Sequence, residues 1–244
     1  IFGQVGIDLS ETVELSIEGR FDREEREVSN KVPQQPSALL FGGGAPLNPA
    51  RSAVDDVIPS RDETFNQFQP KVALRWNWTD ATSVYASYGL GFRSGGFNSL
   101  GSEAVTEFWF NSGDPFGLGS VGAGLDVNDE YDKEVSQAFE LGLKGNYLDQ
   151  RLQLNAAVFQ TNVDDNQFFE FFAGPFGLLR VVTTIDELEL RGAELDFTYL
   201  LADGFTVYGG VGLTDGEIKE NPHRPATEGN EAPLAPEYTL NLGG

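Results

Sequence analysis

The feature that most constrains the fold is an alternation of apolar and polar side chains that recurs along most of the chain. In the stretch VYASYGLGFR, every second residue from Val84 to Phe92 is apolar, whereas the residues between them are polar or small. Successive side chains of a β-strand point to opposite faces of a sheet, so a period of two predicts a strand with one apolar face. That face must be turned either into a protein core or out into lipid.

The same period predicts about eight further strands, with little or no helix between them. The segments are Gly3–Leu9, Val13–Phe21, Val72–Trp78, Phe139–Tyr147, Leu152–Val158, Ala193–Tyr199, Phe205–Leu213 and Tyr238–Gly243. A composition with 29 glycines and 19 phenylalanines also suits strands and turns better than helices. We therefore expect an all-β chain of about nine antiparallel strands.

The connections between these segments are alternately short and long. The short ones are Leu9–Thr12, Thr79–Thr82, Leu148–Arg151 and Leu201–Gly204. The long ones are Asp22–Phe65, Ser94–Lys133 and Thr214–Leu234, with the shorter Ala173–Leu179 in the remaining position. In an up-and-down meander this places all tight turns at one end and the long loops at the other. Outer-membrane barrels have this asymmetry, together with an apolar outer face and a polar lumen.

Aromatic side chains gather close to the predicted tight turns. They are Trp76, Trp78, Tyr85, Tyr147, Phe197, Tyr199 and Phe205. Rings of this kind favour the boundary between lipid and water, so we expect them to be membrane-interface aromatics that form a girdle at this end. The alternative is that they are core aromatics of a soluble β-protein.

The number of strands indicates a part of a larger barrel. An odd number does not close an up-and-down bacterial barrel, and an open sheet would leave bare edges. No apolar run reaches the roughly 20 residues that a membrane helix needs. We therefore expect an antiparallel up-and-down transmembrane β-barrel segment.

Composition excludes several other classes of function. The net charge of −22 argues against nucleic acid as a partner, because binding to a phosphate backbone needs a basic surface. The chain has no cysteine, and it contains no nucleophile elbow or phosphate-binding loop. The single histidine, His223, has no partner at metal-ligand spacing and is interpreted as a solvated loop residue. We therefore expect no catalytic residue, no cofactor, no metal site and no enzymatic activity.

A run of carboxylates from Asp126 to Asp132 leaves two interpretations open. The run comprises Asp126, Asp129, Glu130 and Asp132. Oxygen ligands of this kind could hold Ca²⁺. The alternative is a solvated acidic loop, which is the usual role of such a run.

Four stretches resemble one known family. They are SVYASYGLGFRSGGFN from Ser83, FELGLKGNYLDQRLQLNAAVFQTNVDDNQ from Phe139, RGAELDFTYLLADGFTVYGGVGLTDGEI from Arg191 and APLAPEYTLNLG from Ala232. In this order they resemble the barrel of TonB-dependent outer-membrane receptors of the siderophore-receptor type. The resemblance covers the chain well from about Phe65 onward, and Val5 to Arg26 more loosely.

The resemblance implies a fold, a location and a set of partners. The family's barrel has about 22 strands, lies in the outer membrane of Gram-negative bacteria and surrounds an N-terminal plug domain with a TonB box. Residues 1–244 would be a partial receptor β-barrel domain, without the plug and the remaining strands. The expected function is TonB-dependent active transport of a ferric siderophore or a similar large, scarce nutrient. The expected partners are outer-membrane lipid, the TonB energy-coupling complex and the nutrient ligand.

Candidate ligand-binding residues lie in or beside the predicted long loops. They are Arg93, Phe108, Trp109, Phe110, Phe168 and Phe169. Large rings bury much area at a low cost in conformational entropy, and a guanidinium at the outer mouth could meet an anionic ligand. The alternative is that the rings pack loop against loop or form the outer girdle, and that Arg93 pairs with a carboxylate of the lumen.

Two other functions remain open on the sequence alone. A passive outer-membrane channel or adhesin barrel would share the strand pattern but would have no plug or TonB box. A soluble β-rich binding domain would bury the apolar face and would need no detergent for extraction.

Overall fold

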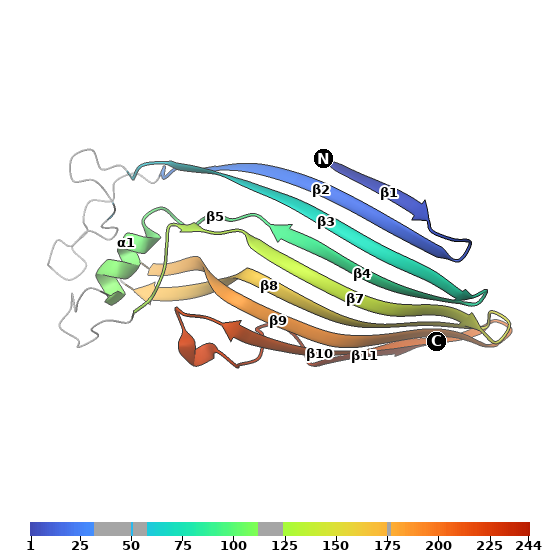
Figure 1. Ribbon diagram of the computed structural model, residues 1–244. Coiled ribbons are helices and arrows are strands. Elements are labelled where there is room, and N and C mark those ends of the chain that lie inside the picture. Colours follow the sequence, from blue (N-terminus) through green and yellow to red (C-terminus); the bar gives the residue numbers. More distant parts are fainter. Residues whose placement is uncertain (32–49, 51–57, 112–123, 175–176) are drawn as a thin grey trace.

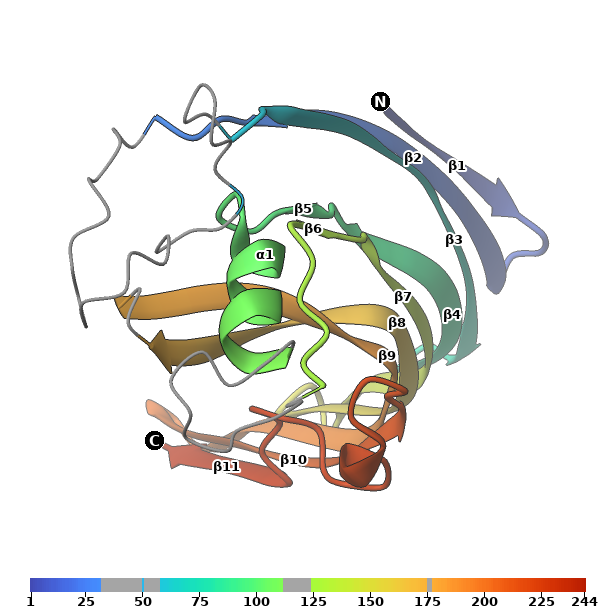
Figure 2. The ribbon, with the colours of Figure 1, turned by 90° about the vertical axis from the view of Figure 1, so that its left-hand side faces the viewer.

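One curved antiparallel sheet dominates the computed structural model, which describes residues 1–31, 50, 58–111, 124–174 and 177–244. Its nine strands are β1 (Phe2–Asp8), β2 (Val13–Val28), β3 (Arg61–Thr79), β4 (Thr82–Arg93), β7 (Glu134–Tyr147), β8 (Leu152–Gly174), β9 (Gly177–Ala202), β10 (Phe205–Glu220) and β11 (Tyr238–Gly243). Their order in the sheet follows their order in the chain, and every neighbouring pair is antiparallel. Figures 1 and 2 show a wall that curves without closing. The predicted all-β, up-and-down architecture is confirmed.

The two ends of the wall differ as the sequence predicted. The connections β1–β2, β3–β4, β7–β8 and β9–β10 are tight turns at one end. In the β7–β8 turn, Leu148, Asp149 and Gln150 all adopt positive φ, at 54°, 53° and 65°. The larger insertions lie at the other end, which we call the outer end. They include α1 (Ser102–Thr106), the π-helical turn η1 (Glu107–Asn111) and the small sheet of β5 (Gly96–Phe97) with β6 (Glu130–Tyr131).

Several strands run further than the apolar alternation indicated. β2 continues to Val28, β3 starts at Arg61, β9 starts at Gly177 and β10 continues to Glu220. Beyond the apolar zone both faces of these strands carry polar side chains, so the alternation disappears while the backbone pairing continues. The structure has little helix, as expected: in the loop between Ser94 and Lys133 it describes α1 and η1, of five residues each.

The apolar face of the sheet is its convex face. Leu74, Tyr88 and Leu141 keep 41%, 45% and 44% of their surface exposed, so these side chains are not packed into a sealed core. The buried Leu188 and Ile218, by contrast, lie on the opposite face. Figure 2 shows the outer-end segments that cover that face inside the curve of the wall, which makes it the concave face. The apolar side chains therefore point away from the interior, as a lipid-facing surface requires.

A ring of polar side chains ends the apolar zone on the convex face. Counting from the tight turns, the first polar residues of the convex face on β2, β3, β7, β8, β9 and β10 are Arg23, Asn66, Gln137, Gln160, Arg191 and Asp215. Arg23 is paired with Asn66 across β2 and β3, and Arg191 lies between Gln160 and Asp215. The zone below this ring has about the length of the roughly 9–11 residues with which a tilted strand spans a bilayer. We take it as the membrane-spanning part. Within the described residues, no helix is long and apolar enough to span a membrane.

The lipid-facing assignment predicts a difference between two faces of the same strand. Leu141→Arg places a charge on the convex face of β7 and should lower the free energy of unfolding by about 2–4 kcal/mol. The matched variant Ala138→Arg places the same charge on the concave face of β7 and should change it by less than about 1 kcal/mol. Chemical unfolding in phospholipid vesicles measures both values. Equal losses in the two variants would contradict the orientation of the sheet.

Candidate functional site

A cavity of about 300 Å³ lies at the outer end of the wall, on its concave side. Three segments far apart in the sequence form it: residues 126–132, the outer part of the β8–β9 hairpin, and residues 221–233 after β10. We call this cavity the mouth pocket. Its lining residues are Asp126, Asn128, Glu130, Tyr131, Asp132, Phe168, Glu170, Val182, Thr183, Thr184, Ile185, Ile218, Asn221, His223, Arg224, Thr227, Asn230, Glu231 and Pro233.

The segment after β10 folds back onto the concave face. Pro222 and Pro225 cannot donate to a strand ladder, so β10 ends at Glu220 and the chain turns. The Ile218 amide donates to the Asn230 carbonyl at 2.9 Å, and the Ala232 amide donates to the Gly216 carbonyl at 2.8 Å. An apolar cluster then holds the segment down, and its members are Val163, Ile185, Leu188, Ile218 and Ala232. These backbone bonds, with an antiparallel bridge between Glu217 and Glu231, and the burial of the apolar groups together fix one wall of the mouth pocket.

Two ion pairs join this segment to the other walls of the mouth pocket. Arg224 lies 2.6 Å from a carboxylate oxygen of Glu170 on β8, and this glutamate side chain is 16% exposed. His223 Nδ1 lies 2.7 Å from Asp126 Oδ2. The interpretation of His223 as a solvated loop residue is therefore incomplete: its side chain is 47% exposed, but it links two loops.

Asn221 contributes a buried acceptor that has no hydrogen-bond partner. The residue is 5% exposed; its Nδ2 donates to Thr227 Oγ1 at 2.9 Å, and its amide donates to Glu228 Oε1 at 3.1 Å. Its Oδ1 has no partner within the described part of the chain. A buried acceptor without a partner costs roughly 1–3 kcal/mol of desolvation. A donor that entered the mouth pocket could recover this free energy.

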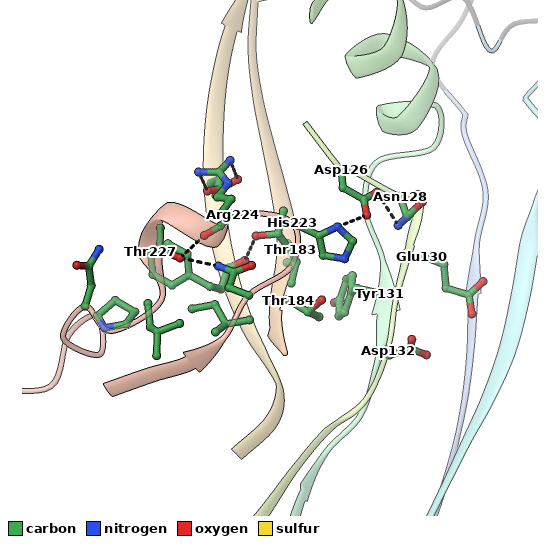
Figure 3. Close-up of a pocket in the computed structure, with 18 of the residues that line it drawn as sticks. Asp126, Asn128, Glu130, Tyr131, Asp132, Thr183, Thr184, His223, Arg224 and Thr227 are labelled. Atoms are coloured by element: carbon green, nitrogen blue, oxygen red, sulfur yellow. Dashed lines mark hydrogen bonds and ion pairs between the residues drawn. The ribbon is translucent and has the colours of Figure 1, made fainter. Parts of the chain in front are cut away.

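The outer end carries more carboxylates than cations. Glu130, Asp132 and Glu231 line the mouth pocket, and no described cationic side chain lies within ion-pair distance of them. Glu130 and Asp132 are turned away from His223 in Figure 3, so they contribute through their charge rather than through contact. In the described ranges no group of three or more Asp, Glu, His or Cys residues could hold a metal ion. The possible calcium site is therefore not supported.

Asp165 lies in the outer part of β8, and its φ of 54° is in the left-handed region. The outer ends of β8 and β9 reach across the interior of the curve (Figure 2). Asp165 lies beyond the polar ring, outside the membrane-spanning part. Burial raises the pKa of this carboxyl, and the nearby charges of Asp132, Asp186 and Asp164 raise it further. This carboxyl therefore lies in a region of negative potential.

A single asparagine holds the free edge of the same hairpin. β10 stops pairing with β9 at Glu187, so the ladder does not cover Val182 on that side. The Asn98 side chain bonds the Val182 backbone where the ladder with β10 is absent. Its Nδ2 donates to the Val182 carbonyl at 2.9 Å, and its Oδ1 accepts from the Val182 amide at 2.7 Å. Its Nδ2 also donates to the Asn128 carbonyl at 2.8 Å. Asn98 therefore ties the hairpin to the segment that carries the acidic lining.

The buried Asp129 has a structural role beside the mouth pocket. Its Oδ2 accepts from the Gly101 amide at 3.0 Å and its Oδ1 accepts from the Glu103 amide at 3.1 Å, at the start of α1. Arg61 lies 3.5 Å from the same carboxylate. Asp129 thus caps the helix, and it orients the chain that leads to Glu130.

The candidate ligand residues are divided between several environments. Arg93 lies 3.4 Å from Glu134, a carboxylate that also accepts from the Gln167 amide at 2.8 Å. Of the predicted rings, only Phe168 lines the mouth pocket, and it stacks on Phe169 with ring centroids 5.7 Å apart.

The aromatic rings of η1 and those at the outer end of β8 are in contact. Trp109 is 8% exposed and packs edge-on against Phe108, with centroids 4.9 Å apart. The ring centroids of Phe110 and of Phe172 on β8 are 5.6 Å apart. The contact joins η1 to β8, so these rings pack loop against hairpin.

The predicted interface aromatics also separate into two groups. By the alternation of their strands, Trp76, Trp78, Tyr147, Tyr199 and Phe205 lie on the convex face near the tight turns. Tyr85 lies on the concave face instead. Its hydroxyl donates to Glu140, Lys144 lies 5.3 Å from its ring centroid, and its ring fills the space beside Gly142.

Sequence reasoning did not find Asn221, Glu170 or Glu231. None of them belongs to a motif, and each becomes part of a site only when three distant segments meet. The two prolines that follow Glu220 gave the only local signal, a turn where the loop begins.

The asparagine bridge predicts a local change in hydrogen exchange. In the full-length receptor, Asn98→Ala removes both side-chain bonds to Val182, and the exposed amide should exchange about tenfold faster or more. The matched control is Asn128→Ala, because the Asn128 side chain bonds only the exposed Asp126. Mass-spectrometric exchange of the peptide around Val182 measures the rates. Equal rates in the two variants would contradict the bridge.

The acidic setting of Asp165 predicts a pH dependence. Because the native pKa is raised, the folded state loses stability as pH rises from near 3.8 through the native value, and the penalty persists at pH 7. Asp165→Asn removes the charge and still tolerates positive φ. It should therefore raise Tm of the full-length receptor at pH 7, by an amount that shrinks toward pH 4. Asp203→Asn in the β9–β10 turn is the control. A gain that is the same at both pH values would contradict the electrostatic cause.

Comparisons with known proteins agree with this architecture. The family described as "TonB dependent receptor-like, beta-barrel" matches residues 1–244. A probable TonB-dependent receptor, BfrD of Bordetella pertussis, is 25% identical over 196 residues, which are 80% of this chain and 23% of that protein.

Solved structures share the fold. The ferric yersiniabactin uptake receptor FyuA from Yersinia pestis has a TM-score of 0.64 at 16% identity and covers 98% of this chain. The ferric-catecholate import receptor Fiu from E. coli K12 has a TM-score of 0.60 at 17% identity and covers 99%. The copper transporter OprC has a TM-score of 0.57 at 21% identity and covers 90%.

The match covers only a part of each relative. The chain spans 23% of the length of the Bordetella receptor and 29%, 30% and 29% of the chains of FyuA, Fiu and OprC. With the family match over all 244 residues and a nine-stranded wall of the expected topology, this chain belongs to the β-barrel family of TonB-dependent receptors.

Proposed function

We propose that this chain forms part of the barrel wall and outer loops of a TonB-dependent active transporter in the outer membrane of a Gram-negative bacterium. The observation that carries the proposal is the two-faced wall: an apolar convex face that ends at a polar ring, and a concave face with the mouth pocket at its outer end. The proposed cargo is a ferric siderophore or another large, scarce nutrient. Not being an enzyme, the protein would move its cargo unchanged.

Membership of the family supports a proposal about the parts of the transporter other than residues 1–244. We propose that residues 1–244 are a partial barrel domain, and that a plug domain with a TonB box and further strands complete a barrel of about 22 strands. FyuA and Fiu are named for ferric yersiniabactin and ferric-catecholate ligands, and OprC for copper. These names support scarce, metal-containing nutrients as the class of cargo.

Two sets of side chains have roles in this proposal. Trp76, Trp78, Tyr147, Tyr199 and Phe205 form the aromatic girdle at the tight-turn end, where their rings face the boundary between lipid and water. At the outer end, Arg93 and the rings from Phe108 to Phe110 and from Phe168 to Phe172 lie where an arriving ligand first meets the protein. The proposal places ligand capture here and the lipid contacts on the convex face.

Energy dependence tests the proposed function. A strain that expresses the full-length protein should accumulate iron-55 from ferric chelates, and this uptake should fall to background when TonB is deleted. The reason is that a plugged barrel opens only when energy is supplied from the inner membrane. The control is an unrelated porin substrate, whose entry should not change in the same strains. Uptake that continues without TonB would instead support a passive channel.

A further inference from the structure

We propose that the mouth pocket binds a protonated amino or guanidino group of the transported ligand, with Asn221 Oδ1 as its direct acceptor. The inference deepens the proposed function, because it names the chemistry that the pocket selects. It is carried by three observations: the hydrogen-bond inventory of the lining, the charge around it and the shape of its walls.

Several donors of the mouth pocket are directed to acceptors within the protein. Arg224 is bound to Glu170, His223 to Asp126, and Thr227 Oγ1 donates to the Arg224 carbonyl at 2.8 Å. Thr183 Oγ1 donates to the Phe168 carbonyl at 3.4 Å. The buried Asn221 Oδ1 remains without a partner. A ligand group with an N–H donor can therefore give Asn221 Oδ1 its hydrogen bond, whereas a group with acceptors alone leaves this atom unsatisfied.

The charge around the mouth pocket favours a cation. Glu130, Asp132 and Glu231 line it without a described cationic partner, and the charge of Asp132 also acts on Asp165. Burial raises the pKa of Asp165, and the charges of Asp132, Asp186 and Asp164 raise it further, so its ionised form is disfavoured in this acidic setting. A cavity with carboxylates of one sign around it concentrates cations and repels anions. An anionic group would have to enter against this potential.

The walls of the mouth pocket favour an organic cation over a bare metal ion. Phe168, Val182, Ile185, Ile218 and Pro233 supply apolar surface that an alkyl stem could cover. Within the described residues, no carboxylate group is arranged to coordinate a metal. A volume of about 300 Å³ is at the lower limit for small-molecule pockets. The mouth pocket therefore has room for one side group of a larger transported ligand.

The test compares three four-carbon probes that differ only in their ends. Isothermal titration calorimetry of the full-length receptor in detergent is run with putrescine, which carries two ammonium groups, with 1,4-butanediol and with succinate. Putrescine should bind, and the neutral and anionic probes should not. Calcium chloride is the fourth probe, because a metal ion is the other possible source of positive charge. Binding of succinate or of calcium in place of putrescine would overturn the inference.

Two substitutions at one position separate a binding role from a structural one. Asn221→Ala removes the acceptor and should weaken putrescine binding about tenfold or more. Asn221→Asp keeps an oxygen at this position and adds a negative charge, so it should strengthen binding. A side chain that only supports the fold would weaken binding in both variants, and that outcome would overturn the inference.

The matched controls are Asn146→Ala and Asn146→Asp at the tight-turn end of the concave face, where Asn146 is exposed. They make the same changes of size and charge far from the mouth pocket and should leave putrescine binding unchanged. Equal effects at the two positions would show that putrescine responds only to the net charge of −22, which would contradict a pocket.

Binding in detergent needs no energy coupling, so the two proposals can fail separately. A receptor that binds putrescine through Asn221 but shows no TonB-dependent uptake would contradict the proposed function alone. TonB-dependent uptake without any putrescine binding would contradict the cationic pocket alone.

Discussion

The whole structure depends on the pairing of backbone amides and carbonyls between neighbouring strands. In lipid these groups have no water to bond, so each strand of the spanning part must lie between two others with no break. The seven strands from β2 to β10 in the sheet meet this demand by the simplest route, in which each strand pairs with the strands before and after it in the chain, and β1 and β11 form the two edges. The tight turns make that order possible, and the register then places apolar and polar side chains on separate faces over the full width of the wall.

Above the polar ring the constraint is different, because water can satisfy the backbone. The strands continue, but their pairing no longer has to be complete, and the chain uses this freedom to build the mouth pocket. β9 runs past the end of β10, the segment after β10 folds inward onto Ile218, and β6 leads the acidic segment across the concave side. The difference between the uniform wall and the irregular outer end therefore follows from where water is available.

The fold could be predicted from the sequence much further than the site. Alternation around residues such as Leu74 and Leu141 is a local property, and it placed all nine strands and both faces. The extensions toward Val28 and Glu220 were missed because polar side chains on both faces carry no period. Asn221 was missed for another reason: its role depends on the burial of its oxygen by segments far away in the chain. Tyr85 shows the same limit, since proximity to a turn does not determine which face a ring occupies.

The Asn98 bridge has a mechanical consequence. From Glu187 to Tyr199, β9 is held on both sides by ladders, and to detach it there would require breaking many bonds in succession. At Val182 the lateral restraint is one amide group, whose bonds can be lost in a single rotamer change. The protein thus combines a wall held by continuous ladders with a hairpin edge held at Val182 by the Asn98 side chain, and loss of these two bonds would leave the ladders of the membrane-spanning part intact.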